Sequence, residues 1–189
     1  MDLVILMASP RPKGYTSRAV DWLTDELILM GHQAEVINLA EFNILPCNGC
    51  SQCQDAQETP FCPLPDEVSL IWEKMIPADA LIWAAPVYFW SLPARAKALL
   101  ERSAALVTGF RDKGHHSLLA GKKLGLLATC GGPAENADQL ISVFSLAGDY
   151  FQQEPLLRLV IEHTYQPDKP DFNDQVRTRY FARLLASKS

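Results

Sequence analysis

The sequence lacks both of the common glycine-rich signatures of nucleotide phosphate loops. The pattern G-x-x-x-x-G-K-[ST], which binds a triphosphate with a lysine and magnesium, is absent. The dinucleotide pattern G-x-G-x-x-G is absent too, because the turn after the first apolar run holds one glycine, Gly14. These absences exclude the usual triphosphate and dinucleotide loops.

Long basic and long apolar runs are also missing. The net charge is −5 and no long basic stretch occurs, which argues against nucleic acid as the main partner. The longest uncharged stretch, residues 80–94, is too short to span a bilayer and contains two prolines. Asp2 follows Met1 with no basic region, so no secretory signal is expected. We therefore expect a soluble cytoplasmic protein without membrane insertion.

Strand and helix patterns alternate along the 189 residues, with no internal repeat and no low-complexity linker. Apolar runs typical of buried strands occupy residues 2–8, 34–39, 80–85, 123–129 and 156–161. Helical patterns lie between and after them: one closes at Gly31, one spans 65–75, one starts at Pro93, one stops at Gly148, and a last one carries Val176, Tyr180 and Leu184. This alternation predicts one α/β domain, a three-layer sandwich with a parallel sheet of order 2-1-3-4-5.

A turn rich in hydroxyls joins the first strand to the first helix. Ser9, Thr16 and Ser17 supply hydroxyl donors and Arg11 supplies a cation. The amides of a helix's first turn have no intrahelical partner and carry the positive end of the dipole. Hydroxyls without a metal ligand suit a phosphate monoester, although an ordinary N-cap would account equally well for the turn alone.

The turns after the third and fourth strands are unusual as well. Residues 86–93 hold the consecutive aromatics Tyr88-Phe89-Trp90 between prolines, and Thr129-Cys130-Gly131-Gly132 lets the backbone approach a ligand closely. The structural alternative for residues 86–93 is a hydrophobic plug beneath a loop, and the alternative for residues 129–132 is a plain strand-to-helix turn. In the predicted strand order all three turns meet at one edge of the sheet. A phosphate monoester beside a flat ring describes flavin mononucleotide (FMN).

Together these motifs resemble the NAD(P)H-dependent FMN reductases of the flavodoxin-like fold, especially the branch with WrbA-type quinone reductases and iron–sulfur flavoproteins. The resemblance covers nearly the whole chain. It rests on Ser9-Pro10-Arg11-x-x-Gly14-x-Thr16, the segment 80–102, Gly121-Lys122-Lys123 and the glycine turn at 131–132.

The resemblance implies an FMN-dependent NAD(P)H oxidoreductase that reduces a quinone, flavin, azo or nitro acceptor. It implies phosphate contacts from Ser9, Arg11, Gly14, Tyr15 and Thr16, and isoalloxazine contacts from Pro86, Val87, Tyr88, Phe89, Thr129, Cys130, Gly131 and Gly132. Ala8 and Tyr15 depart from the usual glycine and asparagine of the family. Because the flavin carries the hydride chemistry, no catalytic side chain is assigned. His115 and His116 are expected to be solvated loop residues.

Four of the five cysteines lie close together in the sequence. Cys47, Cys50 and Cys53 are separated by two residues each, and Cys62 follows after eight more. Such clustering in a reducing compartment indicates metal or redox chemistry, and the segment, at about 45–64, resembles the cluster loop of iron–sulfur flavoproteins. We predict a 4Fe–4S cluster on these four thiolates, with zinc and metal-free redox thiols as the alternatives. Cys130 is expected to be a small buried residue.

Three functional classes fit these observations. The leading one is the oxidoreductase, with NAD(P)H and a small-molecule or protein electron acceptor as its partners. The second is a flavodoxin-like electron-transfer protein that does not use NAD(P)H directly, and the third is a nucleotide-binding module that senses oxidants through its cysteines. The aromatic run 88–90 also predicts a homodimer or homotetramer with the flavin near the interface.

Overall fold

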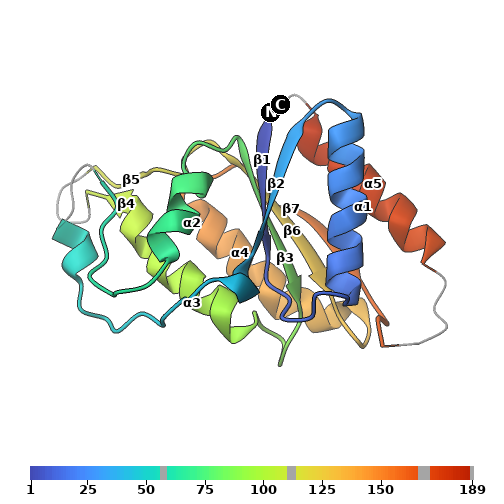
Figure 1. The fold of residues 1–189 in the computed structure, drawn as a ribbon, viewed down its shortest axis with the longest axis horizontal. Helices are drawn as coiled ribbons and strands as arrows, with labels where there is room; N and C mark the ends of the chain where they lie inside the picture. The colour runs from blue at the N-terminus through green and yellow to red at the C-terminus, as the bar shows by residue number, and fades with distance from the viewer. Residues whose placement is uncertain (56–58, 110–113, 166–170, 188–189) are drawn as a thin grey trace.

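Five parallel strands form the central sheet, as Figure 1 shows for the computed structural model, which describes residues 1–55, 59–109, 114–165 and 171–187. The strands are β1 (Asp2–Met7), β2 (Gln33–Asn38), β3 (Ala80–Pro86), β6 (Lys123–Thr129) and β7 (Leu157–Ile161). Their order is β2-β1-β3-β6-β7 and every neighbouring pair is parallel. The predicted flavodoxin-like α/β fold and its order 2-1-3-4-5 are confirmed.

Helices cover both faces of the sheet and complete three layers (Figure 1). On one face lie α1 (Tyr15–Leu29) and α5 (Phe172–Ala186); on the other lie α2 (Val68–Met75), α3 (Ala94–Arg102) and α4 (Asp138–Tyr150). Short 3-10 turns η1 (Leu39–Glu41), η2 (Gln52–Asp55), η3 (Ser103–Leu106) and η4 (Ala134–Ala137) connect them, and β4 (Val107–Thr108) pairs with β5 (His116–Ser117) in a small antiparallel ladder. In the described ranges, no helix has the length and apolar character needed to cross a membrane.

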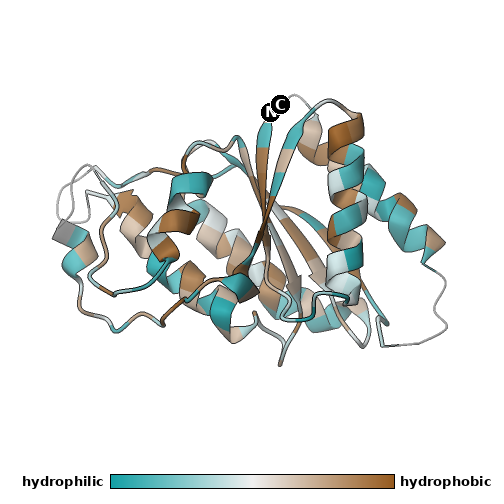
Figure 2. Ribbon diagram, in the orientation of Figure 1, coloured by the Kyte–Doolittle hydropathy of each residue, from teal (hydrophilic) through white to brown (hydrophobic). Residues whose placement is uncertain are grey.

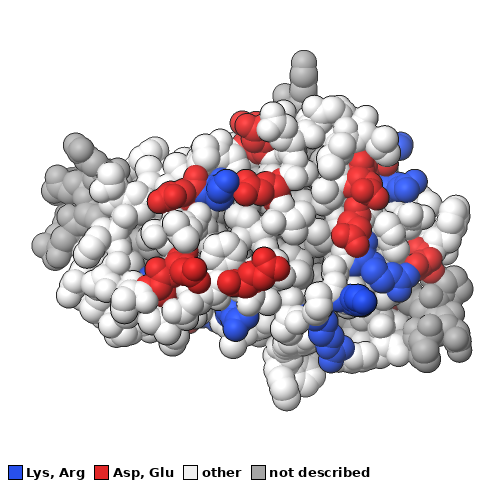
Figure 3. All heavy atoms as spheres, in the orientation of Figure 1, with Lys and Arg blue, Asp and Glu red and all other residues white. Residues whose placement is uncertain are grey.

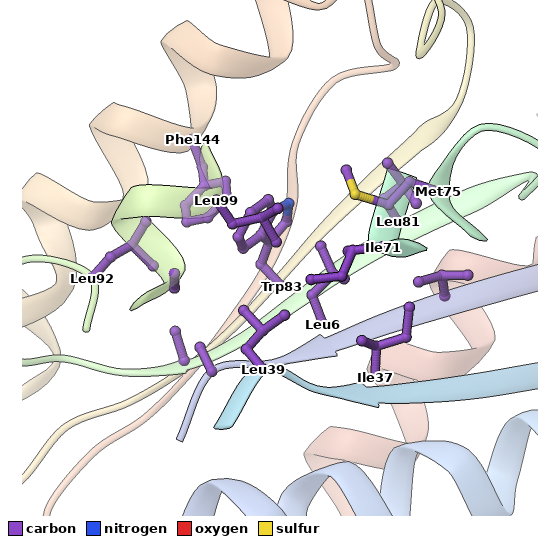
Figure 4. Close-up of a cluster of buried hydrophobic side chains, with 14 of the residues drawn as sticks. Leu6, Ile37, Leu39, Ile71, Met75, Leu81, Trp83, Leu92, Leu99 and Phe144 are labelled. Atoms are coloured by element: carbon purple, nitrogen blue, oxygen red, sulfur yellow. The ribbon is translucent and has the colours of Figure 1, made fainter. Parts of the chain in front are cut away.

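The central strands are apolar on both sides because helices pack on both faces. Every residue of β3 is buried, and brown predominates in the inner strands in Figure 2. On the α2–α3–α4 side the Trp83 ring lies 5.4 Å from the Phe144 ring, measured between centroids. Figure 4 shows this cluster, in which Leu6, Trp83 and Leu99 come from three different elements.

Two helix details differ from the sequence prediction. Helix α4 does not stop at Gly148 but continues to Tyr150. Gly148 is instead a packing glycine, since a Cβ at this position would lie 2.8 Å from the Leu124 side chain. The helix predicted from residue 65 begins at Val68, because the Asp66 side chain accepts from the Val68 N–H at 3.3 Å and the Glu67 N–H donates to the Asn43 carbonyl at 3.1 Å.

Candidate functional site

A polar hollow of about 80 Å³ lies where the carboxyl ends of the central strands meet. The loops after β1, β3, β6 and β7 line it with Ser9, Arg11, Gly14, Tyr15, Thr16, Pro86, Val87, Tyr88, Thr129, Gly131, Thr164 and Tyr165. These loops lie along the lower edge of the molecule in Figure 1. The structure thus brings together the three turns that the sequence singled out. Ser17, the next residue of α1, is not part of the lining.

The turn between β1 and α1 is shaped to receive an anion. Gly14 is the N-cap of α1, no side chain caps the helix, and its first turn carries no acidic residue. A Cβ at Gly14 would lie 3.1 Å from the Arg11 Cβ, so the tight turn favours glycine. Ser9 Oγ accepts a hydrogen bond from the Arg11 N–H at 3.2 Å, which shapes the loop further. The blue side chains near the lower end of α1 in Figure 3 show that this end is basic. The result is a positively polarised helix terminus beside an exposed arginine.

A buried hydrogen bond ties this turn to the end of β6. The hydroxyl oxygens of Thr16 and Thr129 lie 2.7 Å apart, and each residue is 3% exposed. Either hydroxyl can be the donor of this bond, and the backbone amides of the first helical turn are further donors for an anion.

Tyr15 is among the residues that line the hollow, and its hydroxyl points to α5. The hydroxyl donates to Asp174 Oδ2 at 2.6 Å, and Arg18 lies over the Tyr15 ring at 5.0 Å from its centroid. Burial, followed by the hydrogen bond and charge of Asp174, raises the pKa of Tyr15 well above its ordinary range. The Tyr15 side chain thus fixes α5 against α1 and leaves the backbone of the turn for a ligand.

A second, more apolar hollow of about 270 Å³ adjoins the first one. The two share Val87, Gly131 and Tyr165; the second hollow is completed by Phe89, Trp90, Cys130, Gly132 and Asn136. Its surfaces are aromatic rings and glycine backbone, which suit a flat ligand.

The aromatic turn after β3 is not a hydrophobic plug. Phe89 is 91% exposed and Trp90 is 58% exposed, and their φ angles are +48° and +58°. Two reciprocal backbone hydrogen bonds of 3.0 Å between Tyr88 and Ser91 hold the turn. The Trp90 indole N–H donates to Asn136 Oδ1 at 3.3 Å. The turn therefore presents two rings to solvent at the rim of the hollow.

The loop after β7 supplies residues that the sequence analysis did not identify. Hydrogen bonds of 3.0 Å join the backbone N–H of Thr164 to the Cys130 carbonyl and that of His163 to the Gly132 carbonyl. The Tyr165 ring lies so close to Gly131 that a Cβ there would be 2.0 Å from ring carbon Cδ2. In the sequence, the only sign that this loop belongs to the site is that it follows a strand whose carboxyl end lies at the same edge of the sheet.

Comparison with known proteins assigns the chain to a family. Residues 1–155 match the sequence profile described as NADPH-dependent FMN reductase. The chain belongs to the NADPH-dependent FMN reductase family. An iron–sulfur flavoprotein of Methanocaldococcus jannaschii is 36% identical over 111 residues, which are 59% of this chain and 56% of the relative. One from Methanosarcina thermophila is 31% identical over 106 residues, 56% of this chain and 54% of the relative. The chain thus spans about half the length of the curated relatives it matches.

Solved structures share the fold over the whole chain. An NAD(P)H:quinone oxidoreductase from Methanothermobacter marburgensis superposes with a TM-score of 0.74 at 21% identity, covering 100% of this chain and 98% of that one. An FMN-dependent NADH-azoreductase from Bacillus anthracis, solved with FMN, gives a TM-score of 0.75 at 13% identity, with 99% and 100% coverage. At these identities the likeness establishes the flavodoxin-like fold.

The residues present fit the FMN that the family's description names. The polar hollow ends in an uncapped helix terminus beside Arg11, which suits a phosphate. The adjoining hollow offers aromatic rings and the unsubstituted backbone of Gly131 and Gly132, which suit a tricyclic ring. The two hollows share walls, so one molecule with a phosphate at one end and a ring at the other can occupy both.

The four-cysteine segment lies on another part of the molecule. It runs to the left end of Figure 1, away from the lower edge at which the turns meet. Within it, η2 packs against η3, which follows the C-terminal end of α3. Helix α3 starts beside the aromatic turn and, with nine residues, is about 13 Å long. The segment therefore does not lie beside the turn after β1: β2 ends at the same edge of the sheet as β1, and the residues after η1 carry the chain away from that edge.

The four thiols of this segment differ in exposure and influence one another electrostatically. Cys47 and Cys50 are exposed, and Cys53 and Cys62 are half-buried against the core. Burial and then the charge of Cys62 raise the pKa of Cys53, with smaller contributions from Cys47 and Cys50. Four thiols suit a thiolate-ligated centre. Among residues 1–55, 59–109, 114–165 and 171–187, however, no three His, Cys, Asp or Glu side chains converge as metal ligands.

The remaining cysteine and the loop histidines lie elsewhere. Cys130 is 2% exposed, and its Sγ lies 3.4 Å from the carbonyl oxygens of Gly132 and Pro133, as expected for a small buried residue. His116 belongs to β5, and His115 Nε2 lies 2.9 Å from the Tyr150 carbonyl. Neither histidine lines the two hollows.

The Tyr15–Asp174 contact predicts a pH dependence of stability. Because the folded state raises the pKa of Tyr15, the protonated hydroxyl stabilises the fold fully below about pH 10, and this contribution is lost as the pH rises above that value. We expect Tyr15→Phe to lower the free energy of unfolding, measured in urea at pH 8, by about 0.5–3 kcal/mol. The difference in this free energy between the variant and wild type should become smaller above pH 10. Tyr180→Phe, on the exposed side of α5, is the control. A pH-independent difference would contradict this account.

Proposed function

We propose that this chain is an FMN-dependent NAD(P)H oxidoreductase that reduces a quinone, flavin, azo or nitro acceptor. The observation that carries the proposal is the pair of adjoining hollows, one polar at a helix terminus and one lined by rings and glycines. Family membership supports it, as do the names of an FMN-dependent NADH:quinone oxidoreductase of Pseudomonas fluorescens and of the azoreductase with the same fold.

Each part of the site has a role in this function. FMN, when bound, accepts and donates the hydride. Arg11 and the first-turn amides of α1 would hold the phosphate. Gly131 and Gly132 make room for the Tyr165 ring and the Asn136 side chain, which line the hollow for the flavin ring. The exposed rings of Phe89 and Trp90 would border the bound flavin ring. No side-chain acid or base is required, so we assign no catalytic residue.

We also propose that residues 1–189 form one FMN-binding domain, in which the cysteine-rich segment at about 45–64 is an insertion. The continuous sheet and the two cores on its faces support this division. The cytoplasmic location and the expectation of no nucleic-acid partner stay predictions.

The first prediction concerns the nucleotide. Arg11→Ala should weaken FMN binding by roughly 1.5–3 kcal/mol, the contribution of a hydrogen bond to a charged group, measured by flavin fluorescence titration. Lys13→Ala is the control, because Lys13 is exposed in the same turn but does not line the hollow. Equal FMN affinity in both variants, or stoichiometric FAD in the purified protein, would refute the assignment.

The second prediction separates the enzyme from an electron carrier. NADPH or NADH, added without oxygen to the FMN-loaded protein, should bleach the flavin absorption promptly, and an added quinone should restore it. Bleaching by dithionite is the control, because it shows that the bound flavin can be reduced. A flavin that dithionite bleaches and neither nicotinamide nucleotide reduces would identify the flavodoxin-like electron-transfer protein instead.

The third prediction concerns the cysteines. We propose that Cys47, Cys50, Cys53 and Cys62 hold a 4Fe–4S cluster, which the spacing and the names of the iron–sulfur flavoprotein relatives support. Anaerobically purified protein should contain about four iron and four sulfide per chain, and Cys50→Ser should lose them while Cys130→Ser keeps them. Stoichiometric zinc, or no iron in the anaerobically purified wild-type protein, would rule the cluster out.

The fourth prediction concerns assembly. We propose a homodimer or homotetramer with the flavin site near the interface, because two large rings stand exposed at the rim of the site. Light scattering of the FMN-loaded protein at micromolar concentration should give at least twice the chain mass. Replacing both Phe89 and Trp90 with Glu should give monomers, whereas Leu29→Glu, at an exposed position of α1, should not. A monomeric wild-type protein would disprove the proposal.

A further inference from the structure

Two buried hydroxyl groups of the polar hollow form a pair with one hydrogen to spare. Thr16 Oγ1 and Thr129 Oγ1 lie 2.7 Å apart, and both residues line the hollow and are 3% exposed. Each hydroxyl carries one hydrogen and two lone pairs, so their mutual bond uses one of two hydrogens. Neither hydroxyl has a second hydrogen-bond partner among residues 1–55, 59–109, 114–165 and 171–187. The other hydrogen is therefore available to an acceptor in the hollow.

The direction of this bond depends on what the hollow holds. Thr16 lies in the first turn of α1, at the uncapped helix terminus. Thr129 is the last residue of β6, and its carbonyl accepts the Val87 N–H at 2.8 Å. An anion at the terminus attracts the hydrogen of the hydroxyl in the helical turn. Thr129 then donates to Thr16, and the two bonds form a chain in which each polarises the other.

The other groups around the hollow also favour an anion. Ser9 is 3% exposed; its Oγ accepts the Arg11 N–H at 3.2 Å, and its own hydrogen has no partner in the part of the chain that the structure describes. The described residues that line the hollow include no Asp or Glu. The Thr164 hydroxyl is already used, since it donates to the Cys130 carbonyl at 3.0 Å. The hollow thus offers hydrogen-bond donors and a cation, with no carboxylate to repel a phosphate.

We propose that Thr129 is a positioning residue for the phosphate of FMN: it donates to Thr16 and thereby turns the Thr16 hydrogen toward the phosphate. The proposal rests on the FMN-dependent function proposed above and deepens it. The residues after Thr129, Cys130, Gly131 and Gly132, line the second hollow. The end of β6 therefore serves both ends of the cofactor, because its turn borders the ring and its last hydroxyl orients a donor to the phosphate.

Replacement of the two threonines separates this role from plain stability. Thr129→Val removes the hydroxyl and keeps the branched shape, Thr129→Ala removes it with less bulk, and Thr129→Ser keeps it. Thr16→Val removes the donor to the phosphate. Thr178→Val is the matched control: Thr178 is fully buried in α5, its hydroxyl donates to the Asp174 carbonyl at 2.7 Å, and it lines neither hollow. Circular dichroism melting reports the folding of every variant.

The readout is the affinity for FMN and for riboflavin, which has the same ring and no phosphate, measured by flavin fluorescence titration. We expect Thr129→Val and Thr129→Ala to weaken FMN binding about fivefold, as for a neutral hydrogen bond. Thr16→Val should weaken it roughly 10- to 100-fold, as for a hydrogen bond to a charged group. Each of these variants should bind riboflavin as wild type does, and Thr129→Ser and Thr178→Val should bind both flavins normally.

A double-variant cycle tests whether Thr129 acts through Thr16. Thr16→Val combined with Thr129→Val should bind FMN no more weakly than Thr16→Val alone, because the Thr129 hydroxyl then has nothing to orient. Equal losses for FMN and riboflavin, additive losses in the double variant, or wild-type FMN affinity in both Thr129→Val and Thr129→Ala would overturn the proposal. Wild-type protein that binds no flavin would refute the proposed function itself, whereas failure in the variants alone would leave that function intact.

Discussion

The hydrogen bond between the hydroxyls of Thr16 and Thr129 joins the turn after β1 to the end of β6 within the candidate site. One hydroxyl lies in the first turn of α1 and the other at the end of β6, with β3 between their strands. Because both groups are buried, separation would leave two polar atoms without water, which disfavours movement of either turn. The polar hollow and the second, more apolar hollow therefore keep fixed positions relative to each other. A ligand with a phosphate at one end and a tricyclic ring at the other requires this.

The sequence predicted the parts of the structure that depend on local pattern. Strands buried on both faces, such as Leu81–Ala85, have an unbroken apolar sequence, and the turns that follow them were therefore placed at one edge. Gly148 was misinterpreted because a glycine near a helix end resembles a stop, whereas here it makes room for Leu124 across the helix–sheet contact. Such a contact depends on the tertiary packing and has no local signature.

The parts of the candidate site that escaped prediction depend on residues far apart in the chain. Tyr165 and Asn136 join the ring-lined hollow only because the loops after β6 and β7 are bonded together. Arg102 joins the two ends of the cysteine-rich segment, since it hydrogen-bonds the Leu45 carbonyl 57 residues away and the Asp66 carboxylate 36 residues away. Residue types and spacing indicated thiolate chemistry, but they gave no sign of this long-range contact.

The left-handed backbone at Phe89 and Trp90 has a consequence for how this chain can change. Each such residue costs about 1–2 kcal/mol relative to a right-handed conformation, and glycine at either position would relieve that strain. Glycine would also delete the ring that borders the hollow. Selection for thermal stability alone is therefore expected to favour glycine at these two positions and to remove both aromatic rings. A stabilised variant would then lose part of its ligand surface without any change in its core.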